Sequence, residues 1–471
     1  MKTSPQYSYY LNIFFLTFIF SLSSASGQKL KERKPNFIVI LTDDQSWVGT
    51  SFLADPNDPR SKSDYYQTPN MERLANSGMR MTNGYAPAPF CSPTRKSILS
   101  GLTPAKHEYQ KDRQNWTKAF RKQMTIPKIL KTVDPEYVTA HFGKWDARYD
   151  NFTPEEMGYD FSDGLTSNNT GGGKKTLQKE GKEIPFPMGQ AWPKAYDDPK
   201  LIFSLAQKSN DFIETQTKNN KPFYLQISHY AVHLAITHSE KNINRYFKLK
   251  KGQKHFVPAF AAMTEDMDEG IGILLDKIAA LGIGDNTYIF FLSDNGGRTS
   301  IPIGPKQKLD RNFPLRGGKG SMYEGGLRVP FVVSGPGVSS NAHSDVPVTG
   351  LDILPTVARL AGYNEPLPEI IDGGNLESII HNNGVGRVER NKPYLIFHQA
   401  ANRKPKSAIR WGDYKLVKNW ENNVLELFDL SEDVEEKNDL SKQMPERVIK
   451  LNKALEEFLE MANAETKRTE I

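Results

Sequence analysis

Short apolar runs alternate along the chain with segments whose apolar residues recur at helical spacing. The runs are rich in β-branched and aromatic residues and predict buried strands, several of which end directly in polar residues or glycines. The predicted strands are NFIVIL (36–41), YVTAHFGKW (137–145), PFYLQISH (222–229), TYIFFLSDNGG (287–297) and RVPFVVSGPG (328–337). This alternation predicts an α/β fold whose central sheet has helices on both faces.

Three of the segments between these runs have clear helical signals. They are TPNMERLANSG (68–78), PAFAAMTEDMDEGIGILLDKIAALGIG (258–284) and DILPTVARLAG (352–362). Because ligands of open α/β sheets bind at the carboxyl ends of the strands, we expect a site assembled there from residues far apart in sequence.

The pattern changes after residue 390. Strand-like runs lie at PYLIFHQ (393–399), SAIRWGDYKLVKN (407–419) and NVLELFDL (423–430), and the amphipathic helix MPERVIKLNKALEEFLEMA (444–462) follows. We therefore predict a large α/β domain over residues 27–390 and a smaller α+β subdomain with a short antiparallel sheet over 391–471.

The first residues have the outline of a secretory signal peptide. A weakly basic start is followed by an apolar run from Leu11 to about Leu22 and then by small residues, which predicts a signal over residues 1–26, cut near Ser26 or Gly27. The run is short for a membrane anchor, and no cysteine near the cut can carry a lipid. We expect a periplasmic or secreted protein with no stable membrane insertion.

Composition adds little to this picture. The chain has 471 residues, of which 38% are hydrophobic and 25% charged, as in ordinary globular proteins. Its formal net charge of +6 suits an acidic substrate but usually reflects only a lysine-rich surface, and we expect no nucleic-acid partner.

The only cysteine of the chain is Cys91, in APAPFCSPTRKSILSGLTP. An exported protein with one cysteine has no intramolecular disulfide. Pro93 can open a helix that ends at Gly101, and the free N–H groups of such a helix attract anions. Arg95 lies one turn further on and is suited to an oxyanion. From these residues alone, a buried structural thiol is an equally good interpretation.

Two polar pairs at predicted strand ends suggest a metal site. Asp43 and Asp44 end the first strand, and Asp294 and Asn295 end another, followed by glycines. Adjacent carboxylates repel unless a cation lies between them, and oxygen ligands favour Ca²⁺ or Mg²⁺. Taken singly, each pair also fits a solvated turn.

The motif C-x-P-x-R resembles that of the type I sulfatases, which belong to the alkaline phosphatase superfamily. Further matches are FGKWD with Lys144, ISHYAVHLA with His233, and LRGGKGSMYEGGLRVPFVV with Lys319. The last is not a phosphate-binding Walker loop, because Gly320 follows the lysine. The resemblance covers essentially the whole mature chain in the same order. It implies a mixed, mostly parallel alkaline-phosphatase-like sheet.

The resemblance also implies cofactors and roles. A maturase would convert Cys91 to formylglycine, and one Ca²⁺ would be held by Asp43, Asp44, residue 91, Asp294 and Asn295. In the family, residues that match Arg95, Lys144 and Lys319 bind sulfate, and the one that matches His233 protonates the leaving group, with His229 as the competing assignment. The reaction passes through a covalent sulfo-enzyme.

The resemblance leaves the substrate open, and we expect a sulfated carbohydrate such as ulvan, carrageenan or a glycosaminoglycan. Aromatic residues in predicted loops, among them Trp47, Tyr65 and Tyr66, fit a sugar site but are more often packing residues. Alternatives are a phosphodiesterase or phosphonate hydrolase, which usually has a second His- and Asp-rich metal site, and a carbohydrate-binding protein without activity.

The chain departs from the family pattern at one position near the predicted site. Many relatives have histidine two residues after the lysine of FGKWD, where this chain has Asp146. Asp146, His141 or a water molecule would then take the proton when the intermediate collapses.

Overall fold

The computed structural model describes residues 1, 33–107, 113–146, 151–171, 176–179, 182–185, 196–301, 309–399 and 404–467. Residues Lys34–Ile471 form one compact unit. The predicted signal segment, residues 2–26, lies outside the described residues, and the division near residue 390 stays a prediction.

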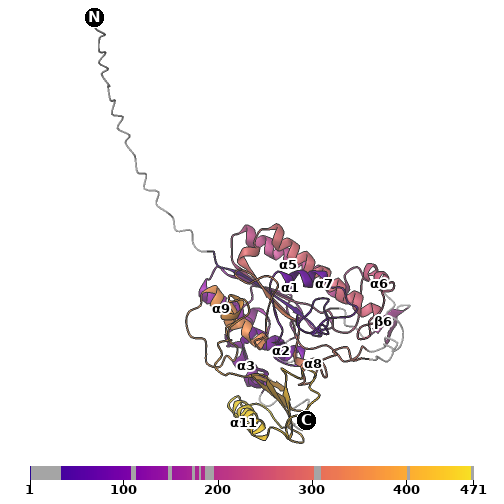
Figure 1. Ribbon diagram of the computed structural model, residues 1–471. Coiled ribbons are helices and arrows are strands. Elements are labelled where there is room, and N and C mark those ends of the chain that lie inside the picture. Colours follow the sequence, from indigo (N-terminus) through magenta and orange to yellow (C-terminus); the bar gives the residue numbers. More distant parts are fainter. Residues whose placement is uncertain are drawn as a thin grey trace. The chain divides into compact units, whose positions relative to one another are not determined.

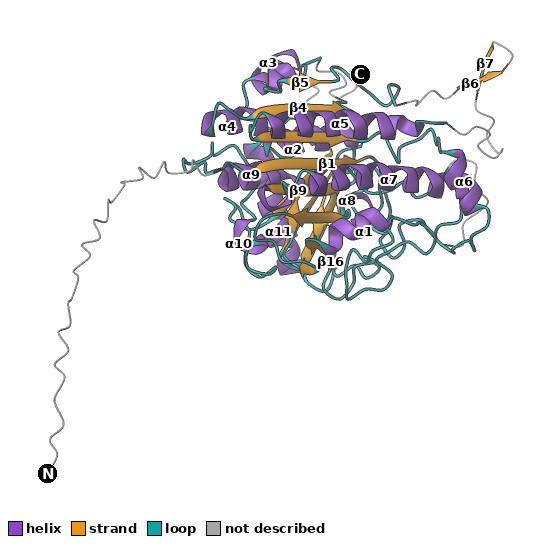
Figure 2. Cartoon of the chain, turned by 90° about the horizontal axis from the view of Figure 1, so that it is seen from above, coloured by secondary structure: helices purple, strands orange, loops and turns teal. Residues whose placement is uncertain are grey.

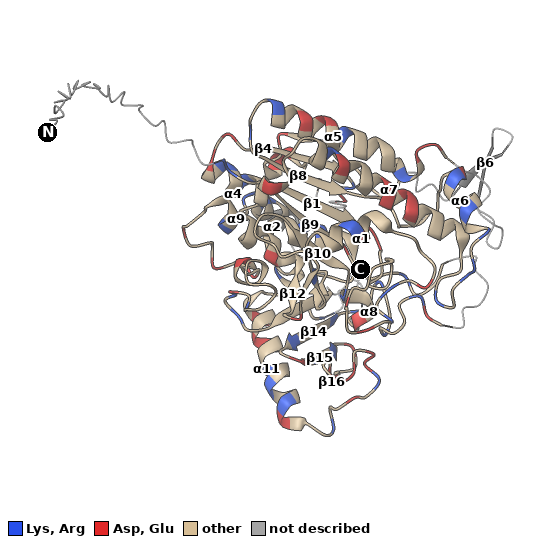
Figure 3. Cartoon of the chain, turned by 45° about the horizontal axis from the view of Figure 1, so that its top comes forward, with Lys and Arg blue, Asp and Glu red and all other residues tan. Residues whose placement is uncertain are grey.

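An eight-stranded mixed sheet forms the centre of this unit, with strand order β11-β2-β10-β9-β1-β8-β4-β5. Strands β9, β1, β8, β4 and β5 run parallel, and β10 runs antiparallel to both of its neighbours. Figure 3 shows β4, β8, β1, β9 and β10 side by side. Their bounds are β1 Asn36–Thr42, β2 Met79–Met81, β4 Val138–Gly143, β5 Phe161–Ser162, β8 Phe223–Ser228, β9 Thr287–Ser293, β10 Phe331–Ser334 and β11 Ala342–Ser344. The predicted mixed, mostly parallel sheet is confirmed.

Helices cover both faces of this sheet because its central strands are apolar on both sides. In β1, Ile38 and Ile40 pack into one core cluster, and Phe37, Val39 and Leu41 pack into another. The first cluster includes residues of α1 (Pro69–Asn76), α5 (Ile202–Lys218) and α7 (Pro258–Ala280). The second includes residues of α2 (Cys91–Ser100), α4 (Ile126–Val133) and α9 (Ile353–Ala361). Figures 1 and 2 show α5 beside α7 on one face of the sheet.

The C-terminal part contains the predicted antiparallel sheet. Strands β13 (Leu395–Gln399), β14 (Lys406–Trp411), β15 (Tyr414–Asn419) and β16 (Val424–Asp429) pair in chain order. The apolar face of α11 (Pro445–Met461) packs on this sheet, with Leu451 and Leu455 against Ile409 and Leu416. This part of the fold prediction is also confirmed.

Buried ion pairs connect this second sheet to a loop of the main sheet. Lys415, on β15, lies 2.9 Å from Glu324 and 2.9 Å from Glu436, and all three side chains are fully buried or nearly so. Glu324 begins α8 (Glu324–Leu327) and also pairs with Arg328 at 2.6 Å. Glu324 therefore pairs with a cation of its own segment and with a cation of the second sheet.

The remaining elements are short or peripheral. Strands β6 and β7 form a two-stranded antiparallel ribbon. None of the helices among the described residues is long and apolar enough to span a bilayer. The other bounds are β3 Gly84–Tyr85, β6 Thr176–Lys179, β7 Lys182–Pro185, β12 Val348–Thr349, α3 Arg113–Arg121, α6 Glu240–Tyr246 and α10 Glu377–Ile380.

Candidate active site

Four neighbouring parallel strands end at the same edge of the sheet, and each is followed by predicted site residues. Asp43 and Asp44 follow β1, Asp294 and Asn295 follow β9, and Lys144 follows β4. The segment after β8 contains both candidate histidines, at 229 and 233. The expected assembly at the carboxyl ends of the strands is present.

Two glycines let these strand ends approach neighbouring backbone. A Cβ atom at Gly296 would lie 1.9 Å from the carbonyl oxygen of Gly325, and one at Gly143 would lie 2.1 Å from that of Ser228. Gly143 also has a φ of +92°, a conformation that other residues rarely adopt. Any larger residue at either position would displace the residues that follow.

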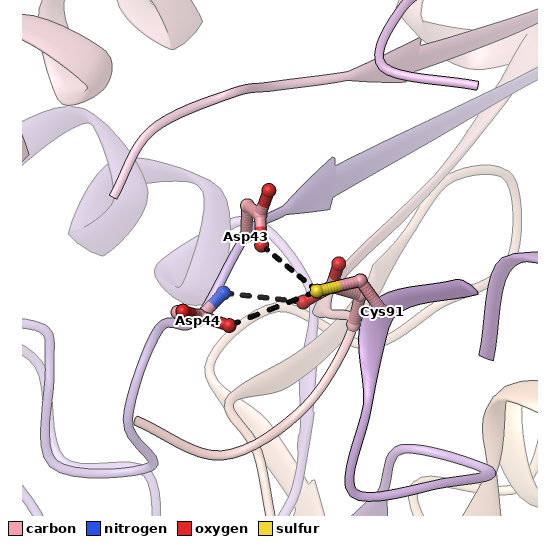
Figure 4. Close-up of side chains that lie close together, drawn as sticks. Asp43, Asp44 and Cys91 are labelled. Carbon is pink, nitrogen blue, oxygen red and sulfur yellow. Dashed lines mark hydrogen bonds between the residues drawn. The ribbon is translucent and has the colours of Figure 1, made fainter. Parts of the chain in front are cut away.

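Cys91 is the first residue of α2, and the helix ends at Gly101 in the left-handed conformation. The thiol lies 3.5 Å from Oδ1 of Asp43 and 3.9 Å from Oδ1 of Asp44 (Figure 4). The Nζ atom of Lys319 donates a 3.2 Å hydrogen bond to Sγ. The lone cysteine therefore lies at the centre of the acidic pair and not in an apolar core.

The surroundings of Cys91 keep its thiol protonated. Burial raises its pKa, and the negative charges of Asp294 and Asp43 raise it further, although Lys144 and Lys319 oppose them. Because the thiolate is the nucleophilic form, the unmodified thiol is a poor nucleophile at this position.

Each of three cationic side chains pairs with a different carboxylate. Arg95 donates from Nη2 to Asp294 at 2.6 Å, Lys144 lies 2.6 Å from Asp43, and Lys319 lies 2.5 Å from Asp44. The loop of Lys319 is fixed by backbone hydrogen bonds to Gly297, which follows β9, and to Pro89, which precedes Cys91. Positive charge therefore surrounds residue 91.

These surroundings shift the pKa values of Asp43 and Asp294 in opposite directions. Burial opposes the ionisation of Asp43, but Lys144, His233 and Arg95 hold its pKa well below the usual range. Burial raises the pKa of Asp294 to about 6, and the charge of Asp43 acts in the same direction. Such opposed shifts are typical of carboxylates that share one site.

The donor set fits a hard divalent cation. Ligand atoms of Asp43, Asp44, Cys91 and Asp294 all lie within 4.8 Å of one another, and among the described residues only this group of acids, histidines and cysteines has such spacing. Within the described part of the chain, Oδ2 of Asp44 and Oδ1 of Asn295 are buried without a hydrogen-bond donor. Oxygen atoms that lack a donor are expected where they bind a cation such as Ca²⁺.

The two candidate histidines have different surroundings. The side chain of His233 is 20% exposed, and its Nε2 lies 3.8 Å from Asp44. His229 is buried, and its Nδ1 has no hydrogen-bond partner. The backbone of this segment pairs with the backbone of Asp43 through Ala231 and Val232. His233 is therefore the histidine that faces the acidic pair.

Asp146 is close to the cation that precedes it in the chain. Its Oδ2 lies 3.5 Å from Nζ of Lys144, and its φ is +54°. His141 is buried, lies 3.1 Å from the hydroxyl of Ser228, and packs edge-on against Trp145. Of these two alternatives for proton transfer, Asp146 is the one that pairs with a lysine of the site.

The structure supports the packing interpretation of the loop aromatic residues over a sugar-binding role. Trp47, Tyr65 and Tyr66 are each at most 3% exposed and belong to packed clusters. Sequence reasoning also overlooked Lys200, which is buried. Burial and the charge of Lys144 lower its pKa, whereas Asp43 and Asp44 raise it. No local motif marks Lys200, because its proximity to these residues results from the fold.

Comparisons with known proteins agree with this geometry. Residues 35–363 match the family model described as Sulfatase, and residues 318–465 match one described as N-sulphoglucosamine sulphohydrolase, C-terminal. A protein named Sulfatase from Formosa agariphila is 28% identical over 94% of this chain and 92% of its own length.

Two further relatives have names or titles that mention carbohydrates. An ulvan-active sulfatase from Formosa agariphila is 26% identical over 75% of this chain and 66% of its own length. The solved structure of Ps i-CgsB in complex with k-i-k-neocarrahexaose superposes with a TM-score of 0.70 at 25% identity, over 90% of this chain and 93% of that one. The family model covers most of the chain, and the polar residues that follow the strands surround Cys91. This chain therefore belongs to the sulfatase family and is an enzyme of the sulfatase type.

Proposed function

We propose that the protein hydrolyses sulfate esters of a sulfated carbohydrate, with a nucleophile made from Cys91 by a maturase. The observation that carries this proposal is the contact of the Cys91 thiol with Asp43, Asp44 and Lys319 in one buried site. A thiol held protonated is of little use there, whereas formylglycine, once hydrated, supplies a hydroxyl nucleophile and would form the covalent sulfo-enzyme.

The acidic residues would hold one Ca²⁺. Asp43, Asp44, Asp294 and Asn295 supply oxygen ligands, with the modified residue 91 completing the set. Bound there, the ion would supply positive charge next to the sulfate and favour the ionised nucleophile. It would also relieve the repulsion among three buried carboxylates.

The cationic side chains are suited to the sulfate itself. Lys144, Lys319 and Arg95 surround residue 91, and each has a carboxylate partner that a bound cation would share. Fixed positive charge in a buried site stabilises an anionic transition state without reorganisation. Binding of sulfate and stabilisation of the developing charge are the roles that we assign to these three residues.

His233 is the proposed general acid. It is the histidine next to Asp44, and it is partly exposed, so that a leaving oxygen can reach it. Burial lowers its pKa, while Asp43 and Asp44 raise it and so favour the protonated form. Donation of this proton to the departing alkoxide would complete the cleavage of the ester.

A carbohydrate substrate is supported by the relatives and not by a sugar in the structure. The similar proteins include one named for ulvan and one solved with a neocarrahexaose. We therefore propose a marine-type sulfated polysaccharide, or oligosaccharides derived from it, as the substrate class. The signal-like start of the chain fits export to the periplasm or beyond.

Release of sulfate from defined sulfated oligosaccharides tests the proposal. Mass spectrometry of residue 91 comes first, because protein in which the thiol is unconverted would be inactive for a trivial reason. We expect release by the converted enzyme and none by Cys91→Ala. A phosphodiester assayed in parallel separates the two hydrolase types, and hydrolysis of that substrate alone would contradict a sulfatase function.

A further inference from the structure

Lys200 is a buried lysine at the edge of the candidate site. It lies just before α5, which leads into β8, so that the start of α5 is at the same sheet edge as the ends of β4 and β8. Burial lowers its pKa, and the charges of Asp43, Asp44 and Lys144 act on it as well. Its ammonium group therefore lies near the acidic pair.

This lysine lacks the partner that a buried cation requires. The residue is 3% exposed, and among the described residues no carboxylate or hydrogen-bond acceptor pairs with it. The nearby Asp198 is already engaged, because its Oδ1 accepts the N–H of Phe203 at 2.8 Å. Burial of an unpaired charge is costly, so that this lysine is a candidate for binding an anionic ligand.

The backbone at this position is also unusual. Lys200 and Leu201 have φ values of +56° and +55°, in the left-handed region that such residues seldom adopt. Both residues directly precede α5, and the side chain of Lys200 is buried there. Sparsely populated backbone conformations of this kind gather at functional sites.

The missing partner is expected to be an anion of the substrate. Lys144, Lys319 and Arg95 already surround residue 91, where the scissile sulfate would bind. Burial lowers the pKa of Lys200 to about 8, so that an anionic ligand would favour its protonated form. A sulfated polysaccharide offers such groups beside the scissile one, as a second sulfate or as a uronate carboxylate.

We propose that Lys200 binds a second anionic group of the sugar, next to the sulfate that is removed, and so selects multiply charged substrates. This inference rests on the proposed function. It makes Lys200 a specificity-determining residue, which sets KM for such substrates and leaves the chemistry at residue 91 unaffected.

Four probes test the proposal with converted enzyme. They are an aryl sulfate, a disaccharide with one sulfate, the same disaccharide with a second sulfate, and the same disaccharide with a uronate. For Lys200→Met we expect kcat/KM on the doubly charged probes to fall by about tenfold to a hundredfold, mainly through KM. Activity on the two singly charged probes should change by less than about twofold. A loss on only one doubly charged probe identifies the second anion as sulfate or carboxylate.

Two variants serve as controls. Lys200→Arg keeps the charge and should restore most of the preference, whereas Lys218→Met, at an exposed lysine at the end of α5, should change nothing. Thermal unfolding of Lys200→Met should show an unchanged or raised midpoint, because an unpaired buried charge is removed.

The outcomes separate this inference from the proposed function. An equal loss on all four probes would assign Lys200 to the scissile sulfate, and no loss on any would make it structural; either result overturns the inference alone. If the converted wild-type enzyme releases no sulfate from any disaccharide, the proposed function fails and the inference fails with it.

Discussion

Lys415 of the C-terminal sheet forms a fully buried ion pair with Glu324, with 2.9 Å between Nζ and the carboxylate. Glu324 lies five residues after Lys319, so that this pair connects the second sheet to the loop that reaches Cys91. The C-terminal part therefore supports the position of a site lysine although it contributes no residue to the site among those described above.

Replacement of Lys415 should destabilise the protein strongly. Lys415→Met leaves Glu324 and Glu436 buried without their shared cation, and we expect the free energy of unfolding to fall by about 3–5 kcal/mol. Denaturant unfolding measures this change. Lys453→Met, at an exposed ion pair of α11, should cost less than about 1 kcal/mol. Equal effects would show that the buried pair is dispensable.

The same cluster predicts a pH dependence of stability. Burial raises the pKa of Glu436 from its usual 4.5 to about 7, although Lys415 opposes this shift. Between these values the folded protein binds more protons than the unfolded chain, so that this group lowers stability as the pH rises.

Glu436→Gln removes that contribution. The difference in unfolding free energy, variant minus wild type, should become more positive by about 1–3 kcal/mol as the pH rises from about 5 to about 8. Unfolding curves at several pH values measure this difference. A constant difference across the range would contradict the raised pKa.

Removal of one proposed metal ligand should weaken calcium binding. Asn295→Ala deletes the buried oxygen that lacks a donor, and we expect calcium affinity to fall by about tenfold or more. Elemental analysis and calcium titration measure this effect. The exposed Asp211→Asn serves as the control, and wild-type protein purified without any bound divalent ion would contradict the proposed site.

The two histidines should differ in their effect on turnover. His233→Asn should lower kcat on a sugar sulfate by about a hundredfold or more, because the alkoxide leaving group needs a proton. The loss should be smaller on an aryl sulfate, whose leaving group is a weaker base. His229→Asn should leave kcat nearly unchanged, and the reverse pattern would exchange the two roles.

Asp146 is expected to take part in proton transfer in place of the usual histidine. Asp146→Asn preserves the left-handed backbone and should lower kcat by about tenfold or more, with KM nearly constant. His141→Gln is the matched comparison, because His141 is buried against Trp145 and Ser228. If only the His141 variant loses activity, the proton passes through His141.

The fold and most of the site could be predicted because their signals are local. Buried parallel strands appear as continuous apolar runs, and Asp43, Asp44, Asp294 and Asn295 directly follow two of them. Lys200 could not be found in this way, because no local motif marks it and only the fold brings it near the acidic pair. The pair of Lys415 and Glu324 joins residues 91 positions apart, and no local pattern indicates it.

The aromatic residues show a second limit of local reasoning. Trp47, Tyr65 and Tyr66 lie in segments without regular structure, where both a sugar-binding role and a packing role were compatible with the sequence, and all three are buried. Whether a loop is packed depends on contacts with residues that are distant in sequence. For example, the hydroxyl of Tyr65 donates a hydrogen bond to the carbonyl oxygen of Tyr246.

The burial of Cys91 also determines when it can be chemically altered. Its side chain is 1% exposed, beneath a lysine and between two aspartates. If a second enzyme makes the proposed conversion, it needs access to this residue, which the folded chain does not offer. We therefore expect the conversion to precede folding, and protein that folds with the thiol intact to stay inactive until it is unfolded again.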